Sequence, residues 1–338
     1  MASSLSGTMK AAAWDSNVGG IHKHIKVTND WPLPKNAKNL PQGATLVRVS
    51  HATLNPVDYK VPELPLVGRL VFGKGVPGLD YAGTVVESTG SQLKPGQLVF
   101  GSLAPPNFST LGEYIVVPKE GCVPIPDGVQ PKDAATLGIA GLTAYQTVVP
   151  FIKPGSKVFI NGGSGGVGTF QIQIAKILGA HVTVTCSGPN VELVKSLGAD
   201  EVIDYRTENV VQTLTRKGQQ YDLIADNVFN GAEIYWSSHK YLKPEGRYVT
   251  IAGNAQFSVI KNMLSIMLWP KALGGGQRKF QFVTCAADAA QYAELAKWLA
   301  EGKLKTIIEK EYELEQAGEA FERLKSGRTR GKLVVKVA

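Results

Sequence analysis

Residues 157–168 have the types and spacing of a turn that binds phosphate groups. Within it Gly163, Gly165 and Gly168 stand in the register GxGxxG. Glycine at these positions lets the backbone turn tightly, lets a phosphate approach closely and lets a helix pack against the preceding strand. The N–H groups of the turn and the positive end of the helix dipole would face a pyrophosphate. The candidate ligand-binding residues of this turn are Gly163, Ser164, Gly165, Gly166, Val167 and Gly168.

The glycine spacing alone is a weak signal, because glycine-rich turns also occur in other α/β domains. Here an apolar run of four residues precedes the turn, and an apolar-periodic helix is expected after it, ending before Gly179. Further β-like runs lie at 181–186, 201–203, 221–226 and 246–251, with a helix expected at about 190–197. Strands that alternate with helices predict a doubly wound parallel sheet, so the chain is expected to bind a dinucleotide.

The charge balance is mildly basic. The chain of 338 residues carries 36 Lys and Arg against 28 Asp and Glu, a formal net charge of +8. A basic balance can indicate a nucleic-acid partner. The basic residues are spread along the chain, however, without a run of five or six and without interleaved aromatic residues. This distribution favours an enzyme that binds a polyanionic cofactor, and no nucleic-acid partner is expected.

Cysteine usage and hydropathy favour a protein of a reducing compartment. Cys122, Cys186 and Cys285 lie far apart and form no CxxC pair, so neither a disulfide framework nor a zinc ribbon is expected. The first ten residues lack the apolar core of a signal peptide. No run reaches the roughly 18–20 apolar residues of a membrane span. We therefore expect a cytoplasmic protein without an integral membrane segment.

One apolar segment, 259–269, is followed by a basic stretch at 271–279. An interfacial membrane helix is one interpretation of this pattern. A helix that covers the mouth of a substrate site, or a buried core segment, is favoured over it, and a cover of this kind would select apolar substrates.

The rest of the chain is β-rich at both ends. Short β-like runs punctuated by Pro and Gly occur at 46–54, 82–88, 97–101 and 113–118. They predict an all-β domain, a small barrel. Helices are expected at 131–150 and 288–301, and the runs 306–314 and 332–337 are again β-like. The end of the chain is therefore expected to return to the first domain, which makes the nucleotide domain an insertion.

Seven motifs together resemble one known family. They are NPVDYK (55–60), VPGLDYAGTVVESTG (76–90), GEYIVVP (112–118), AATLGIAGLTAYQTV (134–148), NGGSGGVG (161–168), LGADEVIDY (197–205) and GKLVVKV (331–337). In type and order they resemble the medium-chain dehydrogenases/reductases, specifically the zinc-independent branch of quinone oxidoreductases and enoyl reductases. The resemblance implies an α/β chain with a GroES-like β-barrel substrate domain at 1–130 and 287–338, and a Rossmann domain at 131–286. In the family the active site lies in the cleft between these domains.

The chain departs from the alcohol dehydrogenases of this family at the catalytic metal. Those enzymes hold zinc with a Cys, a His and a second Cys, and the matching positions here are Asn55, Leu79 and Ile139. An amide and two aliphatic side chains are not zinc ligands, so no metal site is expected. The resemblance then implies hydride transfer to an acceptor that is already activated, such as a quinone or the C=C bond of an α,β-unsaturated carbonyl.

Cofactor choice depends on the end of the second strand of the sheet. An NAD site would place Asp or Glu there for the ribose 2′-hydroxyl, and none occurs before Glu192. Similar NADPH-dependent reductases use Ser, Lys or Arg and Tyr in this region. NADP(H) is therefore favoured. For Tyr205 and Arg206 the alternative is that they belong to an ordinary exposed strand end. The further cofactor candidates are Ser187, Asn190, Tyr205, Arg206, Asn227, Ala252 and Gly253.

The substrate side offers four catalytic candidates, Asn55, Tyr59, Lys60 and Thr143. Lys60 and Thr143 match a lysine and a threonine near the nicotinamide in some fungal enoyl reductases of the branch. By that resemblance, Lys60 would donate a hydrogen bond or proton to an enolate oxygen, and Thr143 would hold the carboxamide. The alternatives are a solvated lysine and an Asx-type turn at Asn55. The tyrosine acid of the mitochondrial enoyl reductases is not inherited, because its position holds Leu66.

These expectations combine into an NADPH-dependent, zinc-independent reductase of an apolar quinone or enone. A trans-acting enoyl reductase of a polyketide or acyl intermediate is the alternative within the same class. A non-catalytic dinucleotide-binding protein, of the kind that the lens crystallins of this branch represent, is the alternative from a different class.

A homodimer is also expected. Residues 280–284 alternate apolar and polar side chains and would form the last strand of the nucleotide sheet. An apolar edge strand can pair with another chain, and related enzymes pair this edge with its twofold copy. The alternative is a monomer whose own segment 259–279 covers the edge.

Overall fold

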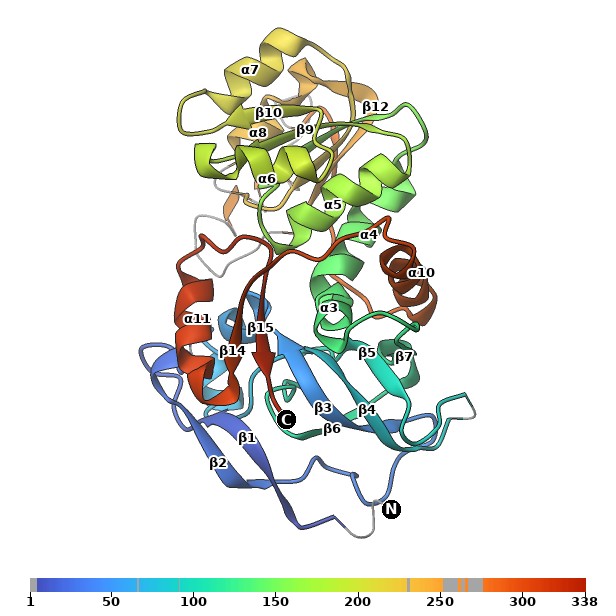
Figure 1. Ribbon diagram of the computed structural model, residues 1–338. Coiled ribbons are helices and arrows are strands. Elements are labelled where there is room, and N and C mark those ends of the chain that lie inside the picture. The colour runs from blue at the N-terminus through green and yellow to red at the C-terminus, as the bar shows by residue number, and fades with distance from the viewer. Residues whose placement is uncertain are drawn as a thin grey trace. The chain divides into compact units, whose positions relative to one another are not determined.

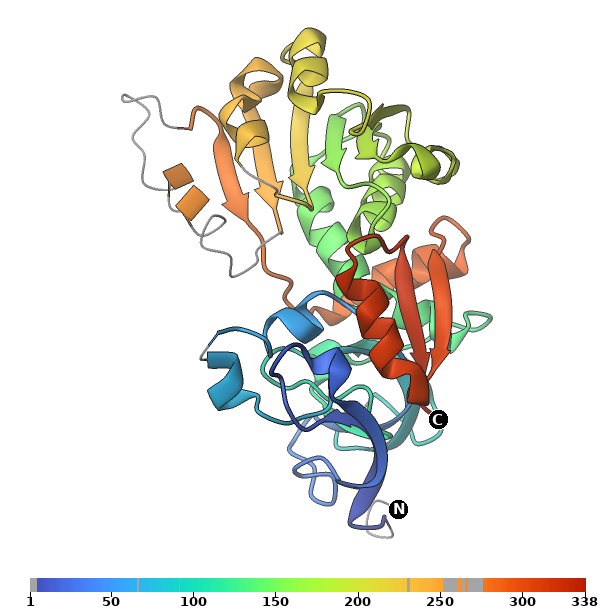
Figure 2. The same cartoon turned by 90° about the vertical axis from the view of Figure 1, so that its left-hand side faces the viewer.

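The computed structural model describes residues 5–65, 67–90, 92–229, 232–251, 261–262, 265–266 and 276–338. The chain divides into two compact units. Unit 1 comprises Met1–Leu142 and Ala286–Ala338, and unit 2 comprises Thr143–Cys285. Figures 1 and 2 show the two units from two directions.

Unit 2 is built on a six-stranded parallel sheet in the order β10-β9-β8-β11-β12-β13. The strands are β8 Lys157–Asn161, β9 His181–Cys186, β10 Glu201–Asp204, β11 Tyr221–Asp226, β12 Leu242–Thr250 and β13 Lys279–Phe282. The predicted doubly wound parallel sheet is confirmed. The strand order reverses at β8, since β9 lies on one side of it and β11 on the other, and ligands of such sheets bind at the carboxyl ends of the strands next to this switch point.

Helices connect the strands of unit 2. They are α5 Gly166–Ile177, α6 Val191–Ser196, α7 Val210–Lys217 and α8 Glu233–Trp236, with 3-10 turns η6 Gly188–Asn190 and η7 Ser238–Lys240. Helices α5 and α6 pack against β8, β9 and β10, and Figure 1 shows them in front of these strands. Helix α5 ends where Gly179 takes a φ of +77°, a left-handed conformation that favours glycine. The core on the β11 side is rich in aromatic residues, which are Phe159, Tyr221, Phe229, Tyr235, Tyr241 and Tyr248.

Unit 1 contains a seven-stranded sheet in the order β14-β15-β3-β4-β5-β7, with β6 paired to β3. The strands are β3 Thr45–Thr53, β4 Asp80–Ser88, β5 Leu98–Ser102, β6 Tyr114–Val117, β7 Val123–Pro124, β14 Ile308–Glu313 and β15 Lys332–Lys336. β15, close to the C-terminus, pairs antiparallel with β3, so the two ends of the chain share one sheet. A separate antiparallel hairpin, β1 Thr8–Trp14 and β2 Ile25–Pro32, was not expected from the sequence.

The helices of unit 1 are short except at its C-terminal end. They are α1 Val57–Lys60, α2 Val67–Val71, α3 Pro131–Ala135, α10 Ala289–Ala300 and α11 Ala317–Lys325, with 3-10 turns η2 Ile21–Lys23, η3 Lys119–Gly121 and η9 Leu314–Gln316. The Asp288 side chain caps α10 by accepting hydrogen bonds from two backbone N–H groups of its first turn. Figure 2 shows α11 beside β14 and β15, and the buried face of α11 packs into the core of the barrel.

The helix expected at 131–150 is present in segments but is interrupted at Gly138. After α3 the chain forms a wider π-helical turn, η4 Leu137–Gly141, before α4 Leu142–Val148 and the 3-10 turn η5 Val149–Phe151. The backbone leaves the helical region at Gly138, where φ is −42° and ψ is −117°. A Cβ atom at Gly138 would lie 2.2 Å from Oδ1 of Asp80. The helix therefore breaks where a carboxylate from β4 reaches its backbone.

Within the described residues no helix is long and apolar enough to cross a bilayer. Most of the segment 259–279 lies outside the described residues, so its assignment as a cover, a core segment or a membrane contact stays a prediction. Ile266, which is described, is 6% exposed and belongs to the core of unit 2.

Candidate functional site

The glycine-rich turn of unit 2 joins β8 to α5 and is tied to the neighbouring strand. Gly162 has a φ of +86°, and its N–H donates to Oγ1 of Thr185 on β9 at 2.9 Å. The N–H of Gly163 donates to the carbonyl oxygen of Thr185 at 2.8 Å. These two bonds hold the turn at the carboxyl end of β9, beside the switch point of the sheet.

The three register glycines have different surroundings. A Cβ atom at Gly168 would lie 2.2 Å from the carbonyl oxygen of Gly162, and one at Gly163 would lie 3.0 Å from Val184. These two glycines therefore allow the helix and strand to pack closely. At Gly165 the nearest atom would be 3.9 Å away. The space beside Gly165 is open to a group that approaches the backbone.

The first turn of α5 offers backbone donors to such a group. Its N-cap is Gly165, which has no side chain to cap the helix. The first N–H groups of a helix have no partner inside it, and here they belong to Gly166, Val167 and Gly168. Among the described residues these N–H groups have no acceptor and the space beside Gly165 is open, an arrangement that fits the pyrophosphate of a dinucleotide.

Three predicted cofactor residues meet at the end of β9. The Asn190 amide nitrogen donates to Oγ of Ser164 at 3.1 Å and to Oγ of Ser187 at 3.2 Å. Its oxygen, Oδ1, is buried without a hydrogen-bond partner in the part of the chain that the structure describes. A buried polar atom of this kind needs an explanation, and a ligand donor is one. The two serine hydroxyls and this amide form one polar cluster beside the glycine-rich turn.

Tyr205 and Arg206 follow β10 and are exposed, Tyr205 to 53%. The Arg206 guanidinium has no ion-pair partner among the described side chains. A carboxylate that the sequence analysis did not consider lies at the same edge. The Asp204 carboxylate accepts a hydrogen bond from the N–H of Arg206 at 3.0 Å, and it would lie 2.8 Å from a Cβ atom at Gly188. The end of β10 therefore carries one cation, the Arg206 guanidinium, and one anion, the Asp204 carboxylate.

Asn227 directly follows β11, on the opposite side of β8 from the serine cluster. Its amide nitrogen donates to Oε1 of Gln171 at 2.7 Å, and its own Oδ1 is buried without a partner in the described chain. The other two predicted cofactor residues, Ala252 and Gly253, lie outside the described residues.

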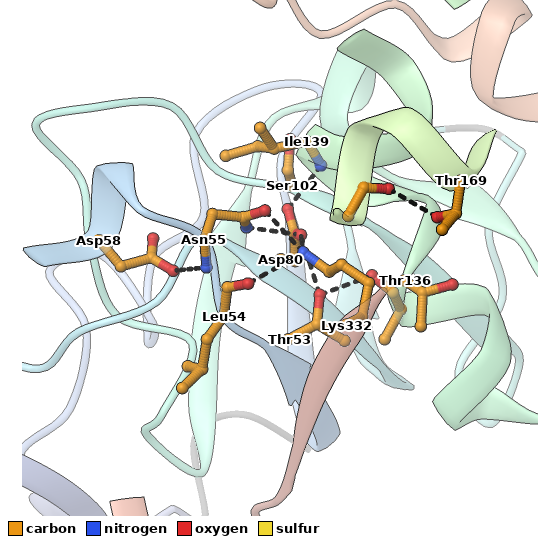
Figure 3. Close-up of polar contacts among 12 residues, drawn as sticks. Thr53, Leu54, Asn55, Asp58, Asp80, Ser102, Thr136, Ile139, Thr169 and Lys332 are labelled. Atoms are coloured by element: carbon orange, nitrogen blue, oxygen red, sulfur yellow. Dashed lines mark hydrogen bonds and ion pairs between the residues drawn. The ribbon is translucent and has the colours of Figure 1, made fainter. Parts of the chain in front are cut away.

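In unit 1 the polar cluster around Asn55 is centred on Asp80, as Figure 3 shows. Oδ2 of Asp80 accepts hydrogen bonds from Thr53 Oγ1 at 2.9 Å and Asn55 Nδ2 at 2.7 Å, and it pairs with Lys332 Nζ at 3.3 Å. Oδ1 of Asp80 accepts from the N–H of Ile139 at 2.7 Å. The Lys332 ammonium also donates to Oδ1 of Asn55 at 2.6 Å. Both ends of the Asn55 amide are thus held inside the protein.

Asp58 is a second buried carboxyl group next to this cluster. It is 0% exposed, and its Oδ2 accepts a hydrogen bond from the N–H of Asn55 at 2.7 Å. Its Oδ1 has no partner among the residues described. Burial, and then the nearby charge of Asp80, raise the pKa of Asp58 well above its ordinary value. The Lys332 ammonium pairs with Asp80, whereas no described cation forms an ion pair with Asp58.

Tyr59 and Lys60 complete the helix α1. The ring of Tyr59 is half-buried beneath the Lys325 ammonium, 5.2 Å from its centroid, and burial raises the pKa of its hydroxyl. Lys60 is also half-buried, and its ammonium has no hydrogen bond or ion pair to a residue in the described ranges. Burial lowers the pKa of Lys60 below its ordinary value. Lys60 therefore has donors available, whereas those of Lys332 are engaged.

Thr143 lies on α4 at the start of unit 2 and is 4% exposed. Its carbonyl oxygen accepts a hydrogen bond from the Thr147 hydroxyl at 2.7 Å. Leu66, which occupies the position of the acid in other enoyl reductases, lies outside the described residues.

The positions that match zinc ligands do not form a metal site. Leu79 is 0% exposed in the apolar core, and the Asn55 oxygen is 2.6 Å from an ammonium nitrogen, which would repel a metal cation. No three His, Cys, Asp or Glu residues in the described ranges are grouped so that they could hold a metal ion. The donor set therefore does not fit Zn²⁺.

Comparison with known proteins places this site in a family. The family model of the alcohol dehydrogenase GroES-like domain matches residues 41–127, and that of the zinc-binding dehydrogenase matches residues 197–335. The trans-enoyl reductase pgmF of Aspergillus terreus is 42% identical over 353 aligned residues, which cover 100% of this chain and 98% of that protein. The chloroplastic quinone-oxidoreductase QR1 of Triphysaria versicolor is 31% identical, and the alignment covers 97% of this chain and 98% of that protein.

Among solved structures, that of a quinone oxidoreductase from Coxiella burnetii has a TM-score of 0.82 and 28% identity, covering 98% of this chain and 100% of that chain. The chain therefore belongs to the medium-chain dehydrogenase/reductase family, in the branch of enoyl reductases and quinone oxidoreductases. It is an oxidoreductase whose fold indicates the use of NAD(P)H, and the predicted family and fold class are confirmed.

Among the residues of these clusters that the sequence analysis missed are Asp80, Gln171, Lys332 and, as noted above, Asp204. Asp80 and Lys332 stand inside motifs that were quoted for the resemblance, but nothing local marks them as partners of Asn55. Gln171 is 0% exposed in the middle of a buried helix. The available signal was the pair of glutamines, Gln171 and Gln173, within that apolar-periodic run.

The raised pKa of Asp58 has a consequence for stability. A carboxyl group whose pKa is raised on folding stabilises the protein fully below its unfolded pKa, and this stabilisation is lost as the pH rises through its folded pKa. Asp58→Asn removes the titration but keeps an oxygen for the Asn55 N–H. The free energy of unfolding of this variant minus that of the wild type should become more positive as the pH rises from 4 to 8, by about 1.4 kcal/mol for each pKa unit crossed. Urea titrations at several pH values measure the difference, and a difference that does not vary with pH would contradict a raised pKa.

Proposed function

We propose that this protein is an NADPH-dependent, zinc-independent reductase that transfers hydride to the C=C bond of an α,β-unsaturated carbonyl compound or to a quinone. One observation carries the proposal: a relative named as a trans-enoyl reductase is 42% identical over the whole chain. The glycine-rich turn and the clusters at the strand ends supply a matching dinucleotide site. An enone and a quinone accept hydride in the same way, because each carries the carbonyl that receives the negative charge.

Each part of the proposed cofactor has residues that fit it. The N–H groups of Gly166, Val167 and Gly168 would hold the pyrophosphate, while Ser187 and Arg206 would hold the 2′-phosphate. NADPH, when bound, supplies the hydride. The chain itself must orient the acceptor and supply a proton donor for its carbonyl oxygen.

We assign the donor role to Lys60. Its ammonium is half-buried and has no competing partner among the described residues, and burial lowers its pKa towards a range in which it can release a proton. Asn55 is held at both ends of its amide and has one N–H left to donate. Tyr59 is the weaker candidate, because burial raises the pKa of its hydroxyl.

The test of this function is NADPH oxidation with a panel of acceptors under one set of conditions. The panel contains a simple enone, a quinone, a thioester of an α,β-unsaturated acid, and a ketone without a conjugated C=C bond. Turnover of a conjugated acceptor with reduction at the β-carbon, or of the quinone, supports the proposal. Turnover of the isolated ketone alone would contradict it. Binding of NADPH without turnover of any acceptor would instead support a non-catalytic dinucleotide-binding protein.

A trans-acting enoyl reductase of a polyketide or acyl intermediate is the second candidate. Besides pgmF, the trans-enoyl reductase poxH of Penicillium oxalicum is 26% identical over 98% of this chain, which supports this reading. If this second candidate is correct, the unsaturated thioester in the panel should react faster than the free enone.

The cofactor preference has its own test. Arg206→Ala should weaken NADPH binding about tenfold and leave NADH binding unchanged, since a charge-assisted contact to the 2′-phosphate is lost. Arg206→Lys keeps the charge and is the matched control. Fluorescence titration with both cofactors gives the ratio of the dissociation constants. Equal affinity of the wild type for NADPH and NADH would contradict the preference.

The role of Lys60 predicts a pH profile. Lys60→Met should lower kcat roughly 100-fold or more, the usual range for loss of a general acid, with little change in NADPH affinity. In the wild type, activity should fall as the pH rises through the lowered pKa of Lys60, because only the ammonium donates. Lys60→Arg retains a cation with a pKa above about 12, so its activity should persist to higher pH. A wild-type rate that is the same across this pH range would contradict the assignment.

We also propose a homodimer through β13, the edge strand of the sheet in unit 2. The N–H of Val283 donates inward to Thr250 on β12 at 2.9 Å, so strand alternation directs the N–H of Phe282 to the open edge. The Phe282 side chain is 45% exposed. No residue in the described ranges accepts a hydrogen bond from this N–H, and an apolar edge of this kind supports pairing with a second copy.

The backbone N–H of Phe282, which points to the edge of the sheet, can be removed selectively. Phe282→Pro deletes the outward N–H and leaves the bond of Val283 to β12, so it should shift a dimer towards monomer. Phe282→Ala keeps the N–H and should have the smaller effect. Light scattering at micromolar concentration measures the mass, and a monomeric wild type would contradict the proposal.

A further inference from the structure

A fully buried glutamine in unit 2 forms a relay with two other polar side chains. Gln171 lies on α5 after the glycine-rich turn and is 0% exposed. A buried amide must be bonded at both ends, and this one is. Its Nε2 donates to Oγ1 of Thr147 on α4 at 2.8 Å, and its Oε1 accepts from Nδ2 of Asn227 after β11 at 2.7 Å.

The relay has a fixed direction because a hydroxyl has a single proton. The Thr147 hydroxyl donates to the carbonyl oxygen of Thr143 at 2.7 Å, so towards Gln171 it can only accept. The Gln171 amide must therefore turn its nitrogen to Thr147 and its oxygen to Asn227. In turn, Asn227 must direct its nitrogen to Gln171. The Ala144 carbonyl oxygen, 3.2 Å from the same hydroxyl, is a second backbone acceptor and leaves this direction unchanged. The orientation of three side chains thus follows from the backbone carbonyls of α4.

The relay ends on an acceptor without a donor. Oδ1 of Asn227 is closed off from solvent and has no partner in the described residues. Asn227 follows β11, and β8, which leads into the glycine-rich turn, separates β11 from β9. In a sheet of this kind the adenylyl half of the dinucleotide lies by the end of β9, where Ser187 and Asn190 are, and the pyrophosphate lies over the turn. The remaining half then passes the end of β11.

We propose that Gln171, oriented by Thr147, is a positioning residue that turns the Asn227 amide so that its oxygen accepts a hydrogen bond from the nicotinamide-riboside half of the cofactor. The inference rests on the proposed function, since it requires a nicotinamide dinucleotide in unit 2. The donor is a ribose hydroxyl or the carboxamide N–H of that half. Without the relay, the Asn227 amide could present its nitrogen instead, and the acceptor would be lost.

Two ligands separate this role from a general loss of structure. NADPH contains both halves, whereas 2′,5′-ADP contains only the adenylyl half with its phosphate groups. Gln171→Leu should weaken NADPH binding about tenfold and change 2′,5′-ADP binding less than about twofold, as measured by isothermal titration calorimetry. Gln173→Leu is the matched control, because Gln173 is also buried on α5, where its Nε2 donates to the carbonyl oxygen of Thr169, whereas Thr147 and Asn227 are bonded to Gln171. It should leave both affinities within about twofold.

A second pair of variants tests the direction of the relay. Thr147→Val removes the hydroxyl and should weaken NADPH binding selectively, as Gln171→Leu does, whereas Thr147→Ser retains the hydroxyl and should bind NADPH as the wild type does. Unchanged NADPH affinity in both Gln171→Leu and Thr147→Val would overturn the proposal. Equal weakening of NADPH binding and of 2′,5′-ADP binding would overturn it too, because the two residues would then only support the fold.

The two hypotheses fail in different ways. A wild-type protein that binds neither NADPH nor NADH contradicts the proposed function and, with it, the positioning role. A protein that binds NADH in preference to NADPH contradicts only the choice of cofactor. The same variants are then compared with NADH and 5′-ADP, and the same selective loss is expected.

Discussion

The Asp80 carboxylate is the constraint on which unit 1 depends. It is 0% exposed and binds four donors from three separate parts of the chain: Thr53 and Asn55, Ile139, and Lys332. A buried charge is tolerated only when it is paired and fully hydrogen-bonded, and removal of one partner typically costs about 3–5 kcal/mol. The same carboxylate breaks the helix expected at 131–150, because it supplies an acceptor to the N–H of Ile139. One ion pair therefore fixes β3 and β4 to β15 and to the turn before α4.

This constraint also decides which residues remain available for chemistry. Lys332 donates to two side chains and a backbone carbonyl, which uses all three of its N–H groups. Asn55 is engaged at both ends of its amide by the same network. Asn55, which stands at a position that matches a zinc ligand of the alcohol dehydrogenases, is thus held in place beside the buried ammonium of Lys332. Lys60, which lies outside the network, is left with donors that no described residue uses, so the proposed proton donor is a side chain that the fold does not need.

The sequence predicted the order of elements in unit 2 well, because apolar periodicity and glycine positions are local signals. Strand β9 was expected at the residues where it occurs, and the stop of α5 was anticipated from Gly179. The sequence predicted the partners of the site poorly, because they are joined by contacts over long distances in the chain. Lys332 and Asn55 are 277 positions apart, and no spacing rule relates them. The hairpin of β1 and β2 was missed for a similar reason, since its pairing depends on tertiary packing more than on intrinsic strand propensity.

The signal that would have found the relay of unit 2 is a violation of pattern. Helix α5 is buried continuously from Gly168 to Ala175, so an apolar residue is expected at every position of this stretch. Thr169, Gln171 and Gln173 are polar there. A buried polar group is normally hydrogen-bonded, and the side chain of Gln171 bonds to two other segments of unit 2 through its contacts with Thr147 and Asn227. The bonds of Gln171 lead to Oδ1 of Asn227, which has no partner in the part of the chain that the structure describes. On the other side of β8, the cluster around Asn190 leads to a second such oxygen. In both cases the amide nitrogen is bonded to other side chains, and the amide oxygen is the atom left without a partner among the described residues.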